Sequence, residues 1–372
     1  SPPFFTMLPQ FCYPGAMKQE IGTIDSNLLP WYQQKKRDLP WRADPSVYRV
    51  WISEVMLQQT RAETVVPYFL RFLDSFPDVF SLAEAPLDAV LKAWEGLGYY
   101  SRARHLHQAA KGIAEKKFFP SDRDGFLGLE GVGEYTAGAI ASIALNQPVP
   151  AVDGNVLRVF SRLYAIPDDV SLGKTRKEIF SLVEGLIPEK QASNFNQALM
   201  ELGATICLPR APLCEACPLY FFCRAREAGE MEKYPITAKK KPPRRETWLA
   251  AIVEKEGKIL LRRRSPEGLL GGLFEFPWFL ALEESERALI QAFREETGLF
   301  LENCRPVMRL SQVFSHIRAE VGVYSAETLG GDLPADWLWV SPGDFENFPW
   351  TRIGCRIRAH FDTTAVAPML GR

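Results

Sequence analysis

The stretch LEGVGEYTAGAI, from Leu129 to Ile140, joins a Gly-x-Gly turn to small and apolar residues at helical spacing. A dinucleotide-binding turn needs a preceding strand and a third glycine, and a P-loop needs Gly-Lys-Ser/Thr; both are missing. The preceding SDRDGFLGLEG predicts a short helix instead. Because backbone N–H groups at a helix start bind phosphate, the turn at Gly131 and Gly133 can hold a phosphate of a nucleic acid backbone, although a Gly-x-Gly turn alone does not establish this.

The length of 372 residues predicts two or three domains. A hydrophobic content of 47% and a charged content of 24% are typical of a soluble globular protein. With a net charge of −1, nucleic-acid binding has to come from local basic patches. No apolar run approaches the roughly 20 residues of a membrane span, and no basic residue precedes the apolar start as in a secretory signal.

The sequence pattern predicts four segments. Residues 1–16 read as an extension, which is a scar, a mis-called translation or a real flexible arm. Residues 17–226 read as helical, with one helix broken at Pro67. Residues 227–247 form a basic, proline-containing linker, which is either a solvated charge run or a further contact with a polyanion. Residues 248–372 have strand-like patterns of apolar and polar residues, with a hairpin turn near Glu256-Gly257, and one helical pattern between the strands. This combination indicates an α+β domain.

Four of the seven cysteines lie within 17 residues, with the spacing Cys207-x6-Cys214-x2-Cys217-x5-Cys223. So few cysteines in so long a chain do not form a disulfide scaffold, and a reduced compartment with one metal site fits better. Four thiolates in one short loop hold either zinc or an iron–sulfur cluster. The spacing alone leaves both open.

These motifs together resemble one family of DNA repair enzymes. The pattern LxGVGxxTA followed by VDxNV resembles the helix-hairpin-helix glycosylases, and the cysteine spacing resembles the [4Fe–4S] loop of endonuclease III and MutY. LPWR, WISEVMLQQTRAETV and GLGYYSRARHL resemble the MutY adenine DNA glycosylase family over roughly Leu39 to Cys223. The resemblance implies an all-α helix-hairpin-helix glycosylase domain, with the hairpin at about 125–140 and a [4Fe–4S] loop at 207–223.

The resemblance also implies catalytic residues. Glu54 matches the acid that protonates N7 of adenine, and Asp153 matches the carboxylate that stabilises the positive charge on the sugar. Tyr135 and Asn155 match residues that assist around the sugar and Asp153. From the residues alone, Glu54 also fits a helix-capping or solvated glutamate, and Asp153 also fits the N-cap of the following helix.

Further residues match family positions that bind the flipped base and the DNA. The expected adenine pocket consists of Arg42, Leu57, Gln59 and Gln197. Tyr99 matches the residue that wedges into the base stack, and Thr60 with Gln59 would lie near the opposite base.

The C-terminal segment resembles a Nudix fold in GGLFEFP and AFREETGL. Aligned on Glu295, Glu296 and Gly298, the arginine and first glutamate of the Nudix box are replaced by Gln291 and Ala292. The metal site is therefore incomplete, and the resemblance implies a lesion-recognition domain. Its expected contacts with 8-oxoguanine are Phe314, Ser315 and His316.

The sequence therefore predicts a monofunctional, monomeric glycosylase that excises adenine opposite 8-oxoguanine, and less well opposite guanine, from double-stranded DNA in a bacterial cytoplasm. Two alternatives are an endonuclease III-like glycosylase/lyase and a catalytically silent DNA-binding module. This chain lacks the lysine that a lyase needs. Tyr135 occupies the position of that lysine, and its neighbours Glu134 and Thr136 carry no amine. A nucleotide pyrophosphatase would need the missing Nudix residues.

Overall fold

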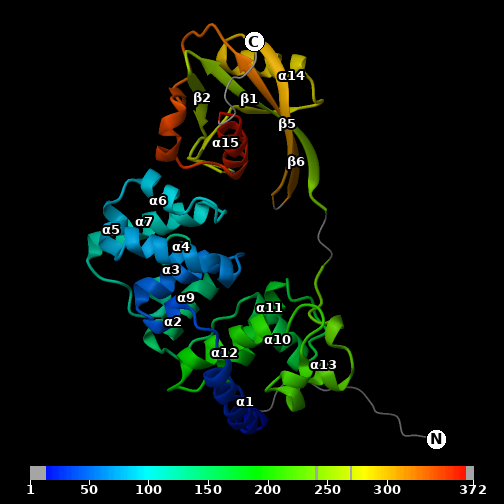
Figure 1. Cartoon of the computed structure of the whole chain (residues 1–372). Coiled ribbons are helices and arrows are strands. Elements are labelled where there is room, and N and C mark those ends of the chain that lie inside the picture. The colour runs from blue at the N-terminus through cyan, green and yellow to red at the C-terminus, as the bar shows by residue number, and fades with distance from the viewer. Residues whose placement is uncertain (1–13, 239–241, 269, 315, 366–372) are drawn as a thin grey trace, which may run out of the picture. The chain divides into compact units, whose positions relative to one another are not determined.

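The computed structural model describes residues 14–238, 242–268, 270–314 and 316–365, and the chain divides into two compact units (Figure 1). The first unit combines Ser1–Gln59 with Glu115–Lys239, and the second combines Thr60–Ala114 with Lys240–Arg372. None of the described helices is long and apolar enough to span a bilayer.

The described part of the first unit is built from helices, as the sequence pattern predicts. Short 3-10 turns cover Cys214–Ala216, Tyr220–Phe222 and Met231–Lys233. The α-helices are α1 (Pro14–Lys35), α2 (Pro40–Ala43), α3 (Val47–Leu57), α8 (Arg123–Leu127), α9 (Glu134–Leu145), α10 (Gly154–Leu163), α11 (Gly173–Glu184), α12 (Ala192–Thr205) and α13 (Arg224–Glu227).

A buried apolar cluster joins α1, α10, α11 and α12. Val156 and Phe160 of α10 and Phe195 and Leu199 of α12 recur at helical spacing and are fully buried in it. Because each helix presents one apolar face to this cluster, the N-terminus of α10 is fixed relative to α12.

The Gly-x-Gly stretch forms the predicted turn between two helices. Gly131 has a φ of 73°, a left-handed conformation that glycine adopts without strain, and Gly133 is the N-cap of α9. Within α9, a Cβ on Gly138 would lie 2.1 Å from the carbonyl oxygen of Pro150. The absence of a side chain at Gly138 therefore lets the segment that leads to Asp153 pack directly on α9.

The second unit contains four helices from the middle of the chain: α4 (Ala62–Ser75), α5 (Val79–Glu84), α6 (Leu87–Ala93) and α7 (Ser101–Lys116). The predicted break at Pro67 is wrong, because this proline lies inside α4. The chain breaks earlier, between Leu57 and Ala62, where Gln59 has a φ of 57°. Pro67 lies one turn inside this new helix, which continues although the proline lacks the N–H that would donate to the carbonyl of Glu63.

The rest of the second unit is a mixed sheet with the order β3-β2-β1-β6-β5, in which β4 pairs with β1 and β7 with β2. Its strands are β1 (Arg244–Lys255), β2 (Lys258–Arg263), β3 (Phe274–Glu275), β4 (Trp278–Ala281), β5 (Glu302–Val313), β6 (Ile317–Glu327) and β7 (Trp337–Val340). The helices are α14 (Glu286–Thr297) and α15 (Arg352–Ala365), with a 3-10 turn at Pro342–Asn347.

Side chains of β1 alternate between two apolar clusters, one on each face of the sheet. Leu249 and Val253 pack in the cluster that contains Phe293 of α14, whereas Ile252 packs in the cluster that contains Ile357 of α15. This period of two is what a strand buried on both faces requires. The predicted α+β class of this domain is confirmed.

Two features of this domain differ from the sequence expectation. The hairpin forms at Glu256-Gly257 as predicted, but β1 begins at Arg244, inside the range expected as linker. From Arg244 onward β1 pairs in parallel with β6, which lies more than 60 residues away in sequence. The helix α15 has no counterpart in the sequence expectation.

Candidate active site

Glu54 lies on the buried face of α3 and is only 4% exposed. Its carboxylate accepts a hydrogen bond from the hydroxyl of Tyr135 on α9. The same hydroxyl lies 3.7 Å from Sδ of Met200 on α12. Glu54 is therefore neither a helix cap nor a solvated side chain, and three helices meet around its carboxyl group.

Burial raises the pKa of Glu54 from 4.5 to about 7. The hydrogen bond from Tyr135 opposes this change, the charge of Asp153 adds to it, and the charge of Arg42 opposes it. A carboxyl group with a pKa near 7 can hold a proton at neutral pH and release it to a substrate.

Asp153 is half-buried at the N-cap of α10, as its position before the helix predicts. Its Oδ1 accepts from the backbone N–H of Val156 at 2.7 Å, and its Oδ2 accepts from the Asn155 amide at 2.8 Å. Burial raises the pKa of Asp153 above its usual value, and these donors and the charge of Arg158 oppose part of that rise. The charge of Asp153 also raises the pKa of Glu54, so the two carboxyl groups are close enough to interact.

Arg158 links Asp153 to the cysteine loop, and sequence reasoning missed it. Its Nη2 donates to Oδ1 of Asn155 at 2.9 Å, and its Nε donates to the carbonyl of Cys207 at 2.8 Å. Nη2 also donates to the carbonyl of Gly203, where a Cβ would lie 2.5 Å from the Cβ of Asn155. The spacing of Asn155 and Arg158 on one helix was the available signal.

The residues predicted to line the adenine pocket all lie in the first unit. Arg42 donates from Nη2 to Glu201 at 2.7 Å, and Gln197 donates to Ser193 at 3.3 Å. Leu57 is partly buried at the end of α3. Gln59, two residues later, is exposed and has a left-handed backbone conformation.

The remaining predicted DNA contacts lie in the second unit. Thr60 is partly buried, and Tyr99 is 46% exposed with a φ of 50°. Phe314 packs partly against the sheet cluster that contains Ile357, and His316 is exposed in the same turn. Ser315 lies outside the described residues.

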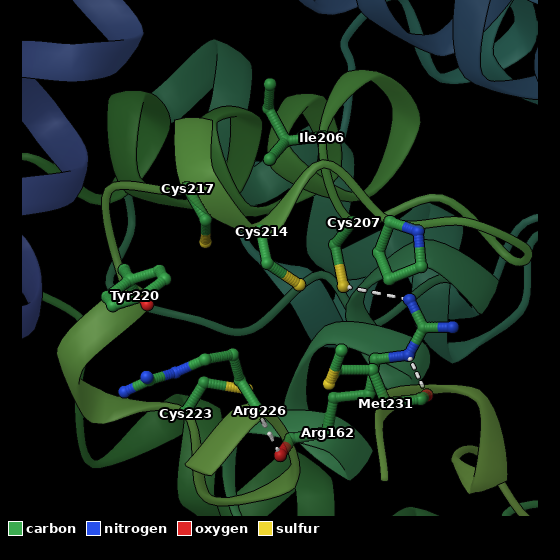
Figure 2. Close-up of a pocket in the computed structure, with 10 residues that line it drawn as sticks. Arg162, Ile206, Cys207, Cys214, Cys217, Tyr220, Cys223, Arg226 and Met231 are labelled. Carbon is green, nitrogen blue, oxygen red and sulfur yellow. Dashed lines mark hydrogen bonds between the residues drawn. The ribbon is translucent and has the colours of Figure 1, made fainter. Parts of the chain in front are cut away.

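The four clustered cysteines line one cavity of about 30 Å³. Figure 2 shows Cys207, Cys214, Cys217 and Cys223 around this space, with Tyr220 and Arg226 at its edge. None of these four cysteines forms a disulfide bond. The guanidinium of Arg226 lies 3.9 Å from the centre of the Tyr220 ring.

Arg162 of α10 organises the loop around this cavity although it is only 1% exposed. It donates to the carbonyl oxygens of Leu208, Pro209, Met231 and Tyr234 at 2.6 to 3.0 Å. Its Nη1 also lies 3.3 Å from Sγ of Cys207. One buried guanidinium thus binds the start of the cysteine loop and the segment that follows it, and places a positive charge beside a thiol.

Burial, together with the charges of the nearby cysteines, raises the pKa of the Cys217 thiol to about 12. The pKa values of Cys214 and Cys223 are raised for the same reasons. In the described residues no three His, Cys, Asp or Glu side chains are close enough together to hold a single metal ion. Thiols with pKa values raised in this way stay protonated at neutral pH unless a bound cation stabilises their thiolate forms.

The two acidic residues left from the Nudix box are engaged within the protein. Glu295 accepts from Nε2 of Gln291 at 2.9 Å, and Glu296 accepts from Nη1 of Arg262 at 2.5 Å. Arg262 also pairs with the buried Glu275 at 2.9 Å. A guanidinium therefore neutralises a carboxylate that a Nudix hydrolase would use for its metal.

Family models match both parts of the chain. Residues 52–189 match the HhH-GPD superfamily of base excision DNA repair proteins, and residues 248–353 match the NUDIX domain. A solved thermostable thymine-DNA glycosylase is 27% identical with a TM-score of 0.52, and the match covers 57% of this chain and 99% of that one.

Curated relatives are similar over most of the chain. Human adenine DNA glycosylase is 35% identical over 88% of this chain and 71% of the human protein. The mouse protein of the same name is 37% identical over 88% and 76% of the two chains. That of Buchnera aphidicola subsp. Acyrthosiphon pisum (strain APS) is 37% identical over 78% and 82%.

The raised pKa of Glu54 predicts a cost in stability at alkaline pH. Between pH 4.5 and about 7 the folded protein binds a proton at Glu54 that the unfolded chain has lost, so stability falls as pH rises. Glu54→Gln, which removes the charge, should stabilise the protein by about 3 kcal/mol at pH 8 and have little effect at pH 5.

Urea unfolding of both proteins at the two pH values measures this difference. A variant that is no more stable than the wild type at pH 8 would contradict the raised pKa.

Proposed function

The chain belongs to the adenine DNA glycosylase family, and on this basis we propose that it excises adenine opposite 8-oxoguanine, and less well opposite guanine, from double-stranded DNA. The reaction hydrolyses the N-glycosidic bond and leaves an abasic site. The observation that carries this proposal is the buried Glu54 carboxyl, whose pKa is raised to about 7 beside Tyr135 and Asp153.

Glu54 is the proposed general acid. Adenine is a poor leaving group until a ring nitrogen is protonated, so an acid has to retain its proton at neutral pH beside the flipped base. Burial among apolar side chains of α3 supplies that pKa, and the Tyr135 hydroxyl holds the carboxyl in one orientation. Glu54 then donates its proton to N7 of adenine.

Asp153 is the proposed stabiliser of the sugar cation. Loss of the base builds positive charge on the deoxyribose, which a nearby carboxylate stabilises. The amide of Asn155 and the backbone of Val156 hold the Asp153 carboxylate, so both of its oxygens have fixed directions. With Tyr135 at the lysine position of the lyases, no amine there can form a Schiff base, and a monofunctional reaction follows.

The other predicted residues bind the base and the DNA in this proposal. Arg42, Leu57, Gln59 and Gln197 take the adenine, and the N–H groups after Gly131 and Gly133 bind a backbone phosphate. The exposed ring of Tyr99 enters the base stack near Thr60, and Phe314, Ser315 and His316 read 8-oxoguanine. The engagement of Glu295 and Glu296 supports recognition rather than hydrolysis by the Nudix-like domain.

We also propose a [4Fe–4S] cluster at the four cysteines. The donor set fits this group, because four thiols line one cavity, and the guanidinium of Arg162 lies beside one of them. Cys207, Cys214, Cys217 and Cys223 would each bind one iron, and the bound cluster would order the loop that carries Arg210, Arg224 and Arg226. No step of base excision passes through it.

Base release under single-turnover conditions tests the proposed activity. A duplex with one adenine opposite 8-oxoguanine should yield strand breaks only after alkali, and faster than a duplex with adenine opposite guanine. Because Glu54 acts in its protonated form, the rate should fall by about tenfold per pH unit above about pH 7. Breaks without alkali would reject the monofunctional reaction, and no release at any pH would reject the enzyme.

Arg158→Gln tests the link between Asp153 and the cysteine loop. The change removes the donors to Asn155 and to the Cys207 carbonyl, so Asn155 loses the contact that orients its amide toward Asp153. We expect base release about 10- to 100-fold slower than in the wild type, as for other lost positioning contacts. A rate within twofold of the wild type would show that Asp153 does not depend on this chain of hydrogen bonds.

Metal analysis tests the cluster independently of activity. The purified protein should contain roughly four iron ions per chain, and Cys217→Ser should lower this content. Cys304→Ser is the matched control, because this half-buried cysteine lies on β5 in the other unit. Stoichiometric zinc in place of iron would contradict the proposed cluster.

A further inference from the structure

Glu201 on α12 is a buried carboxylate that neither the sequence motifs nor the proposed reaction uses. It is 1% exposed and forms ion pairs with two arginines, Arg37 at 2.8 Å and Arg42 at 2.7 Å. It also accepts from the backbone N–H of Arg37 at 3.0 Å. These hydrogen bonds lower the pKa of Glu201 despite its burial, so the carboxylate stays charged.

Arg42 is held by several neighbours at once. Its Nη2 donates to Oε2 of Glu201, its Nη1 donates to the carbonyl of Arg37 at 3.0 Å, and its guanidinium lies 5.5 Å from the centre of the Tyr32 ring. A guanidinium has five N–H donors in a rigid plane. The two hydrogen bonds of Arg42 to Glu201 and to the Arg37 carbonyl therefore determine the directions of its other three N–H groups.

The guanidinium of Arg42 lies near other residues of the candidate active site. The charge of Arg42 is one of the influences on the pKa of Glu54, so the two side chains are near each other. On α12, Gln197 lies one turn before Glu201, and Met200 contacts the hydroxyl of Tyr135. The helix α12 therefore carries Glu201, the predicted pocket residue Gln197, and Met200, which contacts Tyr135.

We propose that Glu201 is a positioning residue that fixes Arg42 so that its remaining N–H groups donate to a ring-nitrogen acceptor of the flipped adenine. Guanine carries a hydrogen on N1, where adenine has an acceptor, so a fixed donor also favours adenine over guanine. The inference rests on the proposed function and adds to it the residue that orients base recognition. One carboxylate between two guanidinium groups leaves a net positive charge, which keeps Arg42 a strong donor.

A double-mutant cycle on Glu201 and Arg42 tests the proposal. Glu201→Gln and Arg42→Gln should each slow single-turnover base release by about 10- to 100-fold. The double variant should be no slower than Arg42→Gln alone, because Glu201 acts only through Arg42. Glu201→Asp, which keeps the charge, should recover part of the rate.

Two controls separate positioning from a general loss of structure. Affinity for the abasic product duplex, which lacks the base, should change by less than about threefold in Glu201→Gln. Ile179→Ala removes a fully buried side chain of α11 from the apolar cluster of the same unit. It should lower the melting temperature while base release is retained, and Glu201→Asp remains the test if Glu201→Gln does not fold.

Additive losses in the double variant, or a wild-type rate in Glu201→Gln beside a slow Arg42→Gln, would overturn the positioning role. Equal loss of product affinity and rate would also overturn it. These outcomes leave the proposed function intact, because they require a wild type that releases adenine. A wild type that releases no adenine rejects the proposed function and this inference with it.

Discussion

The hydrogen bond between the Tyr135 hydroxyl and the Glu54 carboxyl is the contact on which the rest of the site depends. A carboxyl group that is 4% exposed is tolerated only when it is neutral or hydrogen-bonded, and this one bond joins α3 to α9. The same burial that costs stability raises the pKa to about 7 and makes the group useful as an acid. Stability and chemistry are thus opposed at one residue.

Asp153 has a structural task beside the chemical one proposed for it. As the N-cap of α10 it satisfies a backbone N–H, and this same hydrogen bond fixes its carboxylate toward the site. Through Asn155 and Arg158, the carboxylate is connected to the carbonyl of Cys207. The Asp153 carboxylate is therefore connected to a loop that lies about 50 residues further along the chain, and the buried Arg162 holds this loop through its carbonyl oxygens.

Local patterns predicted much of this structure, and long-range contacts account for what they missed. The glycine turn at Gly131, the N-cap at Asp153 and the hairpin at Glu256-Gly257 follow from neighbouring residues, and all three form as expected. The break at Pro67 was wrong because the left-handed Gln59 ends the preceding helix first. Glu201 could not be predicted, because its partners lie about 160 residues away and only the fold reveals them.

A direct titration of Glu54 tests the central claim. Carbon-13 NMR of protein labelled at the glutamate carboxyl carbon, with Glu54 assigned by its absence from Glu54→Gln, reports the pKa in the free protein. We expect a pKa of about 7, and a higher one in Tyr135→Phe, because that hydroxyl stabilises the charged form. A pKa near 4.5 would mean that Glu54 is ionised at neutral pH and would contradict its role as the acid.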